Sequence, residues 1–326
     1  MKVLVTGGAG FIGSNLVRSL LSRGDSVRIL DNFSNGKHEN LKELKNDAEL
    51  LEADIQDMSS CLQACEGMDA VLHQAALGSV PRSVQEPMRT HQVNVNGTLN
   101  LLLAARDRGL KRFVFASSSS VYGNTPENVK SETLLLRPLS PYAVSKLAGE
   151  AYSVTFSKVY GLETVALRYF NVFGPRQDPE STYAAVVPRF ASSLLAGKSP
   201  GIYGDGLQTR DFTYVENVVR ANLLALECPP EACGKAYNIA CGGSTSINDL
   251  FRIMRERVGG EAMKVVPTYD PPQAGDVRDS LASIDAAREA LGYVPTIGVE
   301  EGIELTIDWY RSRRQENSRR LSKSTS

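Results

Sequence analysis

The sequence predicts an α/β fold, in which a doubly wound parallel sheet is followed by a smaller carboxyl-terminal α/β lobe. Short β-rich segments alternate with helix-like segments through the first half of the chain, which is typical of a parallel sheet with helices on both faces. The expected strands comprise residues 2–6, 26–31, 49–53, 70–73, 112–116 and 164–168. The expected helices comprise residues 12–22, 58–65, 88–108 and 142–160.

The second half of the chain follows a less regular pattern, with Gly and Pro among short elements. We therefore expect a first domain over residues 1–170 and a smaller lobe over residues 171–314. Residues 236–240 are expected to return to the main sheet. Residues 315–326 are polar and charged without apolar periodicity, which predicts a disordered tail.

Composition excludes several classes of protein. The chain has 326 residues, which is enough to bury a large core, and its hydrophobic content of 42% and net charge of −1 are those of a globular protein. We expect no nucleic-acid partner, because there is no basic field. We expect no membrane span, because no apolar run approaches ~20 residues. The chain begins with an expected strand instead of a signal peptide, so a cytoplasmic location is predicted.

The cysteines and histidines do not predict a metal site. The cysteines are odd in number, include no Cys-x-x-Cys pair and have few histidines near them, which favours reduced structural thiols. His73 lies in an apolar segment, where a hydrogen-bonded core imidazole is expected. The cysteines are Cys61, Cys65, Cys228, Cys233 and Cys241.

The first expected strand runs directly into three spaced glycines. Gly7 permits a tight turn, Gly10 lets the backbone approach a pyrophosphate, and Gly13 lets the following helix pack closely on the sheet. The amino terminus of that helix, near Phe11, would face the phosphate charge. Spaced glycines alone are a weak signal, because strand-turn-helix units also use glycine without any ligand.

An acidic residue at the end of the second strand strengthens this interpretation. Asp31 follows the glycines by about 20 residues, where a carboxylate can bind a ribose 2′-hydroxyl and repel a 2′-phosphate. The alternative is a surface acid at a strand end. The spacing favours NAD over NADP as the cofactor.

Tyr142 and Lys146 are candidates for acid–base chemistry. They lie four residues apart at the start of an expected helix, just after Pro141, so their side chains project from one face. A neighbouring ammonium and an oxidised nicotinamide would both favour the phenolate and lower the tyrosine pKa, which makes Tyr142 a usable base. The spacing alone proves little.

A run of serines follows the strand at 112–116. These hydroxyls, from Ser117 to Ser120, would lie at the carboxyl end of the sheet, where such folds bind ligands. The alternative for a serine run is a flexible loop.

Several segments together resemble the extended short-chain dehydrogenase/reductases, and within them the nucleotide-sugar (UDP-hexose) 4-epimerases. The resemblance covers the chain from Lys2 to about Arg314. The segments that carry it are Gly7–Gly13, Asp31–Ser34, Asp54–Ile55, Ser117–Gly123, Tyr142–Lys146 and Arg168–Pro175.

The resemblance implies a Rossmann-type domain that holds NAD and a carboxyl-terminal lobe that holds a UDP-sugar. Tyr142 and Lys146 would be the catalytic pair, and Ser118 would hydrogen-bond the sugar O4. The implied NAD contacts are Gly7, Gly10, Phe11, Ile12, Gly13, Asp31, Asn32, Ser34, Gly36, Asp54, Ile55, Gln74, Ala75, Asn94, Tyr142, Lys146 and Phe170. The implied substrate contacts are Gly78, Ser79, Ser118, Ser119, Ser120, Tyr142, Asn171, Gln177, Ala185, Tyr203, Arg210, Asp276 and Ser280.

The reaction implied is inversion at C4 through a transient 4-keto sugar. Residues 73–83 and 173–179 resemble the subgroup that handles UDP-N-acetylglucosamine. Epimerases restricted to glucose and galactose tend to carry Tyr where this chain has Ser280, so an open pocket for a 2-acetamido group is expected. An open pocket also admits UDP-glucose and UDP-galactose.

Four alternatives and one departure from the family pattern remain. Related dehydratases and decarboxylases carry a carboxylic acid near the position of Ser118, which this chain lacks. Two further alternatives are a reductase and a non-catalytic NAD-binding sensor on the same fold. Gln273 stands where relatives usually have an Arg near the diphosphate, so Arg210 alone, or Arg278 with it, would carry the positive charge that binds the diphosphate.

Relatives form homodimers through a four-helix bundle, which would use residues 88–108 and 142–160 here.

Overall fold

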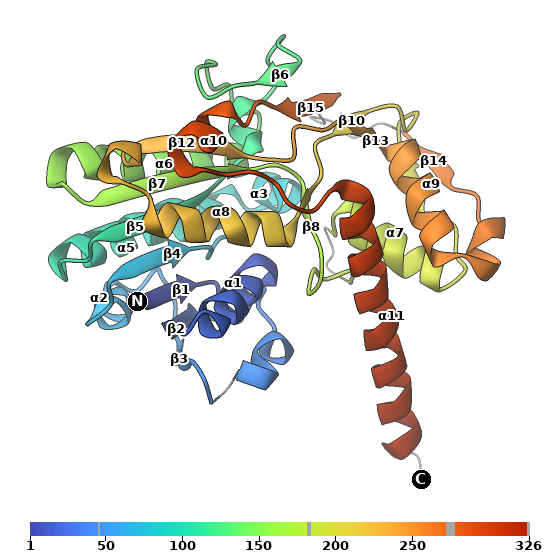
Figure 1. The fold of residues 1–326 in the computed structure, drawn as a ribbon, viewed down its shortest axis with the longest axis horizontal. Coiled ribbons are helices and arrows are strands. Elements are labelled where there is room, and N and C mark those ends of the chain that lie inside the picture. The colour runs from blue at the N-terminus through green and yellow to red at the C-terminus, as the bar shows by residue number, and fades with distance from the viewer. Residues whose placement is uncertain (45, 181–183, 272–277, 325–326) are drawn as a thin grey trace.

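The structure, a computed structural model, describes residues 1–326 except 45, 181–183, 272–277 and 325–326. Its main feature is a seven-stranded sheet in the order β12-β7-β5-β4-β1-β2-β3, in which every neighbouring pair is parallel. The chain starts at the centre and winds outward in both directions, which confirms the doubly wound fold (Figure 1). The strands are β1 (Lys2–Thr6), β2 (Ser26–Asp31), β3 (Glu49–Glu52), β4 (Ala70–His73), β5 (Arg112–Ser118), β7 (Glu163–Tyr169) and β12 (Lys235–Ile239).

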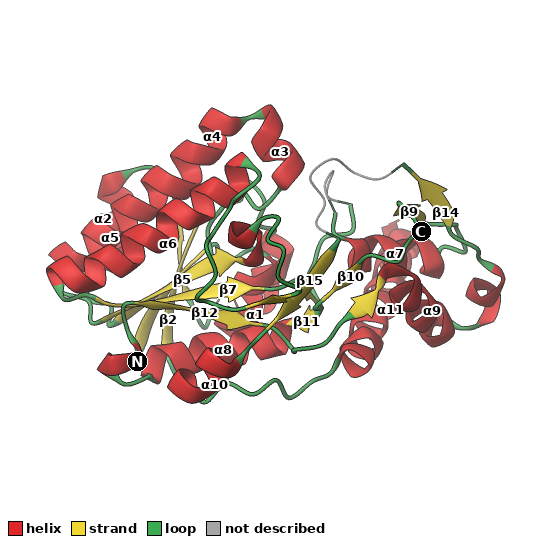
Figure 2. Cartoon of the chain, turned by 90° about the horizontal axis from the view of Figure 1, so that it is seen from above, coloured by secondary structure: helices red, strands yellow, loops and turns green. Residues whose placement is uncertain are grey.

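Helices cover both faces of this sheet, so its central strands are largely apolar (Figure 2). Val3, Leu4 and Val5 of β1, for example, are fully buried. One face carries α2 (Met58–Cys65), α5 (Gly97–Asp107) and α6 (Pro141–Tyr160). The other carries α1 (Phe11–Ser22), α8 (Val215–Glu227) and α10 (Asp285–Leu291).

The helix expected over residues 88–108 is instead divided into three pieces. These are α4 (Pro87–His91), a π-helical turn η2 (Gln92–Asn96) and α5 (Gly97–Asp107). The sequence analysis did not anticipate α3 (Val80–Gln85), which begins at a Ser79 side chain that accepts a hydrogen bond from the Arg82 N–H. A π turn widens the helix, and such turns are often found at functional sites.

The smaller lobe contains short strands and three helices. A four-stranded sheet has the order β13-β10-β15-β6, and two pairs are β11-β8 and β14-β9. Phe190, Phe251 and Ile303 are central to its hydrophobic core. Its elements are β6 (Val129–Lys130), β8 (Val172–Phe173), α7 (Val186–Leu195), β9 (Gly201–Tyr203), β10 (Thr209–Arg210), β11 (Thr213–Tyr214), β13 (Thr245–Ser246), α9 (Ile247–Val258), β14 (Thr268–Asp270), β15 (Asp279–Ala282) and α11 (Val299–Ser324).

The carboxyl-terminal segment corrects an expectation. Residues 315–326 were expected to be disordered, but α11 continues to Ser324 (Figure 1). This part of the sequence has no Gly or Pro to end the helix, and Arg313 forms ion pairs with Glu316 one turn later and with Glu39. Across the part of the chain that is described, no helix is both long enough and apolar enough to cross a bilayer.

Candidate active site

The glycine turn after β1 has the geometry that its sequence predicts. Gly7 has a φ of +68°, and the Gly10 N–H donates to the Gly7 carbonyl oxygen at 3.0 Å. A Cβ atom on Gly13 would lie 2.1 Å from that same oxygen. Larger side chains at Gly7 and Gly13 are therefore incompatible with this turn.

The turn leaves the amino terminus of α1 open to a ligand. Gly10 is the N-cap residue, and no side chain among the described residues caps the helix. Beside it is a pocket of about 90 Å³, which we call the glycine-turn pocket. Free backbone N–H groups and the positive end of a helix favour a phosphate, so the residues present fit a dinucleotide.

Asp31 closes one side of the glycine-turn pocket. Its carboxylate accepts hydrogen bonds from the Ala9 N–H at 2.9 Å and the Phe33 N–H at 2.8 Å. Burial raises the pKa of Asp31, although these two hydrogen bonds oppose the shift. A Cβ on Gly36 would lie 2.8 Å from an Asp31 oxygen, so a larger residue there would displace the carboxylate.

Most of the residues expected to contact NAD line the glycine-turn pocket. They are Gly7, Gly10, Asp31, Asn32, Ser34, Gly36, Asp54, Ile55, Gln74 and Ala75. Seven others do not line it, namely Phe11, Ile12, Gly13, Asn94, Tyr142, Lys146 and Phe170. Phe170 is fully buried in the core, and Gly13 packs closely against the backbone of Gly7.

Six lining residues were missed by the sequence analysis. Most are neighbours of expected residues at the carboxyl ends of β2, β3 and β4, so the strand-end pattern could have indicated them. Val93 lies on the π turn, which no pattern predicted. The six are Leu30, Asn35, Ala53, Ala76, Leu77 and Val93.

His73 is a core residue, as expected. Its ring nitrogens hydrogen-bond with Thr6 Oγ1 at 2.7 Å and Thr98 Oγ1 at 2.9 Å. Burial lowers the pKa of His73 to about 3, so the ring is neutral at physiological pH. The Thr98 hydroxyl donates to the Asn94 carbonyl oxygen at 2.6 Å, which connects the ring to the π turn.

Asn94 connects the π turn to α6. Its side-chain amide donates to Ser145 Oγ at 2.9 Å, and the Ser145 hydroxyl donates to the Tyr142 carbonyl oxygen at 2.7 Å. Asn94 Oδ1 also accepts the Leu77 N–H at 2.8 Å. Asn94 thus holds a wall of the glycine-turn pocket against the start of α6.

Tyr142 and Lys146 lie at the start of α6, beside the carboxyl end of β5. Pro141 occupies the first turn, and Ser140 caps the helix by accepting the Ala143 N–H at 3.1 Å. Lys146 Nζ donates to the Ala116 carbonyl oxygen at 2.9 Å. Burial lowers the pKa of Lys146 to about 8.

Burial has the largest effect on the pKa of Tyr142. It raises this pKa, and a hydrogen bond from Ser118 opposes the rise. The lowering expected from the sequence depends on the Lys146 ammonium together with an oxidised nicotinamide, so it stays a prediction. Additional positive charge beside the ring is needed to favour the phenolate.

The serines at the end of β5 belong to regular structure and do not form the flexible loop that was the alternative interpretation. Ser118 Oγ accepts hydrogen bonds from the Ser120 N–H at 3.2 Å and the Ser120 hydroxyl at 2.9 Å. Ser119 and Ser120 begin the 3₁₀ helix η3 (Ser119–Tyr122). Because Ser118 also bonds Tyr142, the three hydroxyl groups of Ser120, Ser118 and Tyr142 form a chain.

A second pocket, of about 290 Å³, lies in the smaller lobe, and we call it the lobe pocket. Four expected substrate contacts line it, namely Asn171, Ala185, Tyr203 and Arg210. Arg189, which the sequence analysis missed, also lines it and stacks on the Tyr203 ring at 5.2 Å. Arg189 lies on α7 and belongs to no sequence motif, so the sequence alone could not indicate that it lines a pocket.

The other expected substrate contacts lie outside the lobe pocket. Gln177 has a buried Oε1 with no hydrogen-bond partner among the described residues, and Ser79 caps α3. A Cβ atom on Gly78 would have no described atom within 4 Å. Ser280 of β15 is the register partner of Arg210 in β10. Asp276, like Gln273, lies outside the described residues. Arg278 is exposed and pairs with Asp205 at 3.8 Å.

Comparison with known proteins agrees with this geometry. Residues 3–240 match the NAD dependent epimerase/dehydratase family. A putative UDP-glucose 4-epimerase from Methanocaldococcus jannaschii is 40% identical over 314 residues, which cover 95% of this chain and 98% of that protein.

Two solved structures have the same fold over nearly their whole length. One is a Thermotoga maritima UDP-glucose 4-epimerase with UDP-glucose, with a TM-score of 0.90 and 40% identity, covering 96% of this chain and 99% of that one. The other is a Methanobrevibacter ruminantium UDP-N-acetylglucosamine 4-epimerase with UDP-N-acetylmuramic acid, with a TM-score of 0.90 and 41% identity, covering 96% and 98%. The chain therefore belongs to the NAD-dependent epimerase/dehydratase family of extended short-chain dehydrogenase/reductases, and its cofactor is NAD.

Proposed function

We propose that this protein is an isomerase that inverts C4 of UDP-hexoses through a transient 4-keto sugar. The observation that carries the proposal is the hydrogen bond between Ser118 and Tyr142 at the end of β5, with Lys146 four residues further along α6. The glycine-turn pocket and the lobe pocket supply separate places for a dinucleotide and a nucleotide sugar. The identities above support the same class of reaction.

The proposed chemistry assigns each residue one task. Tyr142 removes the O4 proton and later returns it, and Ser118 orients the sugar hydroxyl toward the tyrosine. The chemistry that NAD supplies when bound is reversible hydride transfer at C4 of the sugar. Lys146 holds positive charge near the reacting atoms while its ammonium is anchored on the Ala116 carbonyl oxygen.

Inversion also requires the sugar to turn without leaving. In the proposal, the lobe pocket holds the nucleotide and diphosphate, through groups such as Tyr203 and Arg210, while the hexose rotates. This remote binding energy keeps the keto intermediate on the enzyme. Arg278 is exposed and paired with Asp205, so Arg210 is the better candidate for the diphosphate charge.

For substrate choice, we propose that UDP-N-acetylglucosamine and its galacto epimer are accepted, together with UDP-glucose and UDP-galactose. Ser280 is the register partner of Arg210 in parallel strands, so both side chains lie on the same face, and Arg210 lines the lobe pocket. A small side chain at Ser280 leaves room on that face. Among the described residues Gln177 Oε1 has no hydrogen-bond donor, so in the proposal it accepts the amide N–H of the 2-acetamido group.

The test is to incubate the NAD-loaded protein with each UDP-hexose and follow the C4 epimers by NMR. All four sugars should interconvert in pairs. Ser280→Tyr should stop epimerisation of the acetylated pair and spare the other pair. The substrate proposal fails if the wild type converts only the non-acetylated pair, or if the Tyr variant still accepts both.

The alternatives have less support. The described residues at Ser118–Val121 offer no carboxylic acid for a dehydratase or decarboxylase. A dehydratase would be detected in the same NMR experiment as loss of the C6 hydroxyl. A decarboxylase would be detected by adding a UDP-uronic acid, which would lose carbon dioxide. A reductase would consume external reduced cofactor. A non-catalytic sensor would bind UDP-hexose without converting it.

We also propose that two copies associate through α6 and the adjoining α4–α5 segment. Figure 2 shows these helices along one outer side of the molecule. That side exposes apolar side chains, among them Met88, Val144 and Val159. Sedimentation should give a dimer, and Met88→Glu with Val159→Glu should give a folded monomer. A wild-type monomer at micromolar concentration contradicts this proposal.

A further inference from the structure

A second chemically distinctive cluster lies at the amino-terminal ends of strands in the main sheet, whereas Ser118 lies at the carboxyl end of β5. Arg112 and Glu163 are register partners at the amino-terminal ends of β5 and β7, and Ser118 pairs with Tyr169 at the other ends. The two pairs are six residue steps apart along the strands, a distance of about 20 Å. The cluster is therefore outside the site described above.

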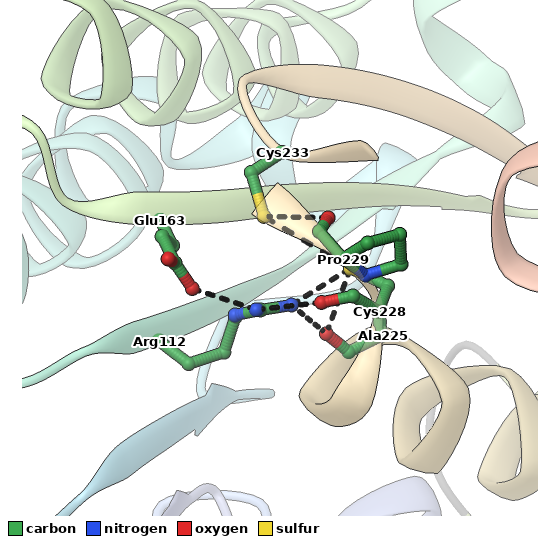
Figure 3. Close-up of polar contacts among 6 residues, drawn as sticks. All are labelled: Arg112, Glu163, Ala225, Cys228, Pro229 and Cys233. Atoms are coloured by element: carbon green, nitrogen blue, oxygen red, sulfur yellow. Dashed lines mark hydrogen bonds and ion pairs between the residues drawn. The ribbon is translucent and has the colours of Figure 1, made fainter. Parts of the chain in front are cut away.

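In this cluster two thiols lie next to a buried guanidinium (Figure 3). Cys228 follows the last residue of α8, and Cys233 follows the short 3₁₀ helix η4 (Pro230–Ala232). The two Sγ atoms are 3.9 Å apart, and Arg112 Nη1 is 2.7 Å from Cys228 Sγ. A turn of four residues between the cysteines thus places both sulfur atoms together.

The same guanidinium is fixed by three other contacts. Arg112 donates to the carbonyl oxygens of Ala225 at 2.7 Å and Cys228 at 2.8 Å, and to the Glu163 carboxylate at 2.7 Å. Its side chain is only 4% exposed, so its charge is poorly screened. The cation is therefore held in place against Cys228 Sγ and favours a thiolate there.

We propose that Cys228 and Cys233 form a reversible redox pair, in which Cys228 reacts with hydrogen peroxide and Cys233 then closes a disulfide. Cys228 is buried, with 7% of its surface exposed, and Cys233 is partly exposed. A hydrogen bond from Cys233 and the adjacent Arg112 lower the pKa of Cys228, although burial opposes the shift. By contrast, burial raises the pKa values of Cys61 and Cys65 to about 12.

The two steps balance without any group from the enzyme's NAD site. The Cys228 thiolate attacks one peroxide oxygen and breaks the O–O bond; with one proton this gives a sulfenic acid and water. The Cys233 thiol then attacks the sulfenic sulfur, the S–O bond breaks, and a second water leaves as the disulfide forms. Peroxide is reduced and the two sulfur atoms are oxidised by two electrons in total. A low-molecular-weight thiol reverses the change by exchange.

The test uses the full-length, NAD-loaded protein. It is treated with a small excess of hydrogen peroxide, alkylated under denaturing conditions and digested with trypsin. Both cysteines fall on one peptide, residues 221–235, so a disulfide is seen as loss of two hydrogens and absence of alkylation. We expect this peptide to oxidise first, to recover with dithiothreitol, and Cys61, Cys65 and Cys241 to stay alkylatable.

Variants separate the two roles. In Cys233→Ser, dimedone should trap a sulfenic acid on Cys228, whereas in Cys228→Ser the Cys233 thiol should oxidise roughly tenfold more slowly than the wild-type pair. Peroxide oxidation that is equal at all five cysteines, or absent at Cys228, overturns the proposal.

The Glu163 carboxylate provides a sharper test that leaves both thiols in place. Its negative charge opposes the Cys228 thiolate, and glutamine keeps the shape and an acceptor for Arg112. Glu163→Gln should speed peroxide oxidation of Cys228 by roughly threefold near pH 6.5 and shift its pH midpoint downward. Glu49→Gln, in the Arg28–Glu49 ion pair of β2 and β3, is the matched control and should change neither. An unchanged or slower rate in Glu163→Gln contradicts the proposed role of Arg112.

Discussion

At the residue scale, the proposed chemistry depends most on the phenol of Tyr142, because no other described side chain bonded to Ser118 can take up a proton in its place. Tyr142→Phe deletes one oxygen and little volume. We expect at least ~10²-fold loss of kcat, with NAD and UDP-hexose binding retained, because the acid–base step is lost. Tyr152→Phe, the same change on the outer side of α6, is the control and should be neutral. Turnover near that of the wild type in Tyr142→Phe would reject the assigned base.

The Ser118 hydroxyl gives a prediction about pH. The tyrosine acts as its phenolate, so activity rises as pH increases through the pKa of Tyr142. Burial raises that pKa and the Ser118 hydrogen bond opposes the rise, so Ser118→Ala should move the rising limb of kcat/KM to higher pH, by roughly one unit. The loss of kcat should be smaller than in Tyr142→Phe. An unmoved limb would show that the hydroxyl does not tune the base.

The positions of single residues were the most predictable part of the candidate site. Asp31 and Ser118 could be placed at the carboxyl ends of strands, which a parallel sheet gathers together, and Tyr142 could be placed at the start of α6. The pKa of Tyr142 could not be predicted, because desolvation depends on packing around the ring. Arg189 reaches the lobe pocket from the first turn of α7, and its contact with Tyr203 exists only in the folded lobe.

At the scale of elements, the junction of β1 and α1 fixes the cofactor site. A Cβ on Gly13 would lie 2.1 Å from the Gly7 carbonyl oxygen, so Gly13→Ala must push α1 away from the turn. We expect purified Gly13→Ala to retain less than about a tenth of the bound NAD, measured by releasing the nucleotide and quantifying it. Gly298→Ala, where no described atom is near the new Cβ, should keep full NAD content. Equal NAD content in the two variants would contradict this account of the turn.

Long periodic elements were predicted well, and interruptions were not. The helix at α6 begins where Ser140 and Pro141 indicate, because capping is local chemistry. The π turn at Gln92–Asn96 left no mark in the apolar pattern, because it is set by the contacts of Asn94 with Leu77 and Ser145. The end of α11 was misjudged, because a polar segment without Gly or Pro can extend a helix that is already nucleated.

At the scale of the whole molecule, the two pockets belong to different parts of the chain that are joined by shared strands. Residues expected to return to the main sheet form β12, whereas β6, from the first half of the chain, joins the sheet of the smaller lobe. Short pairings such as Leu281 with Val129 carry no sequence signal, because two-residue strands lack a readable period. In the proposed reaction, one sugar nucleotide would extend from the lobe pocket to Tyr142.

The measurement that tests the central claim most directly follows the hydrogen on C4. A UDP-hexose labelled with deuterium at C4 is incubated with the NAD-loaded protein in ordinary water, and the epimer is analysed by NMR and mass spectrometry. Transient oxidation predicts that the inverted product retains deuterium at C4, because the hydride never exchanges with solvent. An inverted product with solvent hydrogen at C4, or no inverted product from any UDP-hexose, would contradict the proposed reaction.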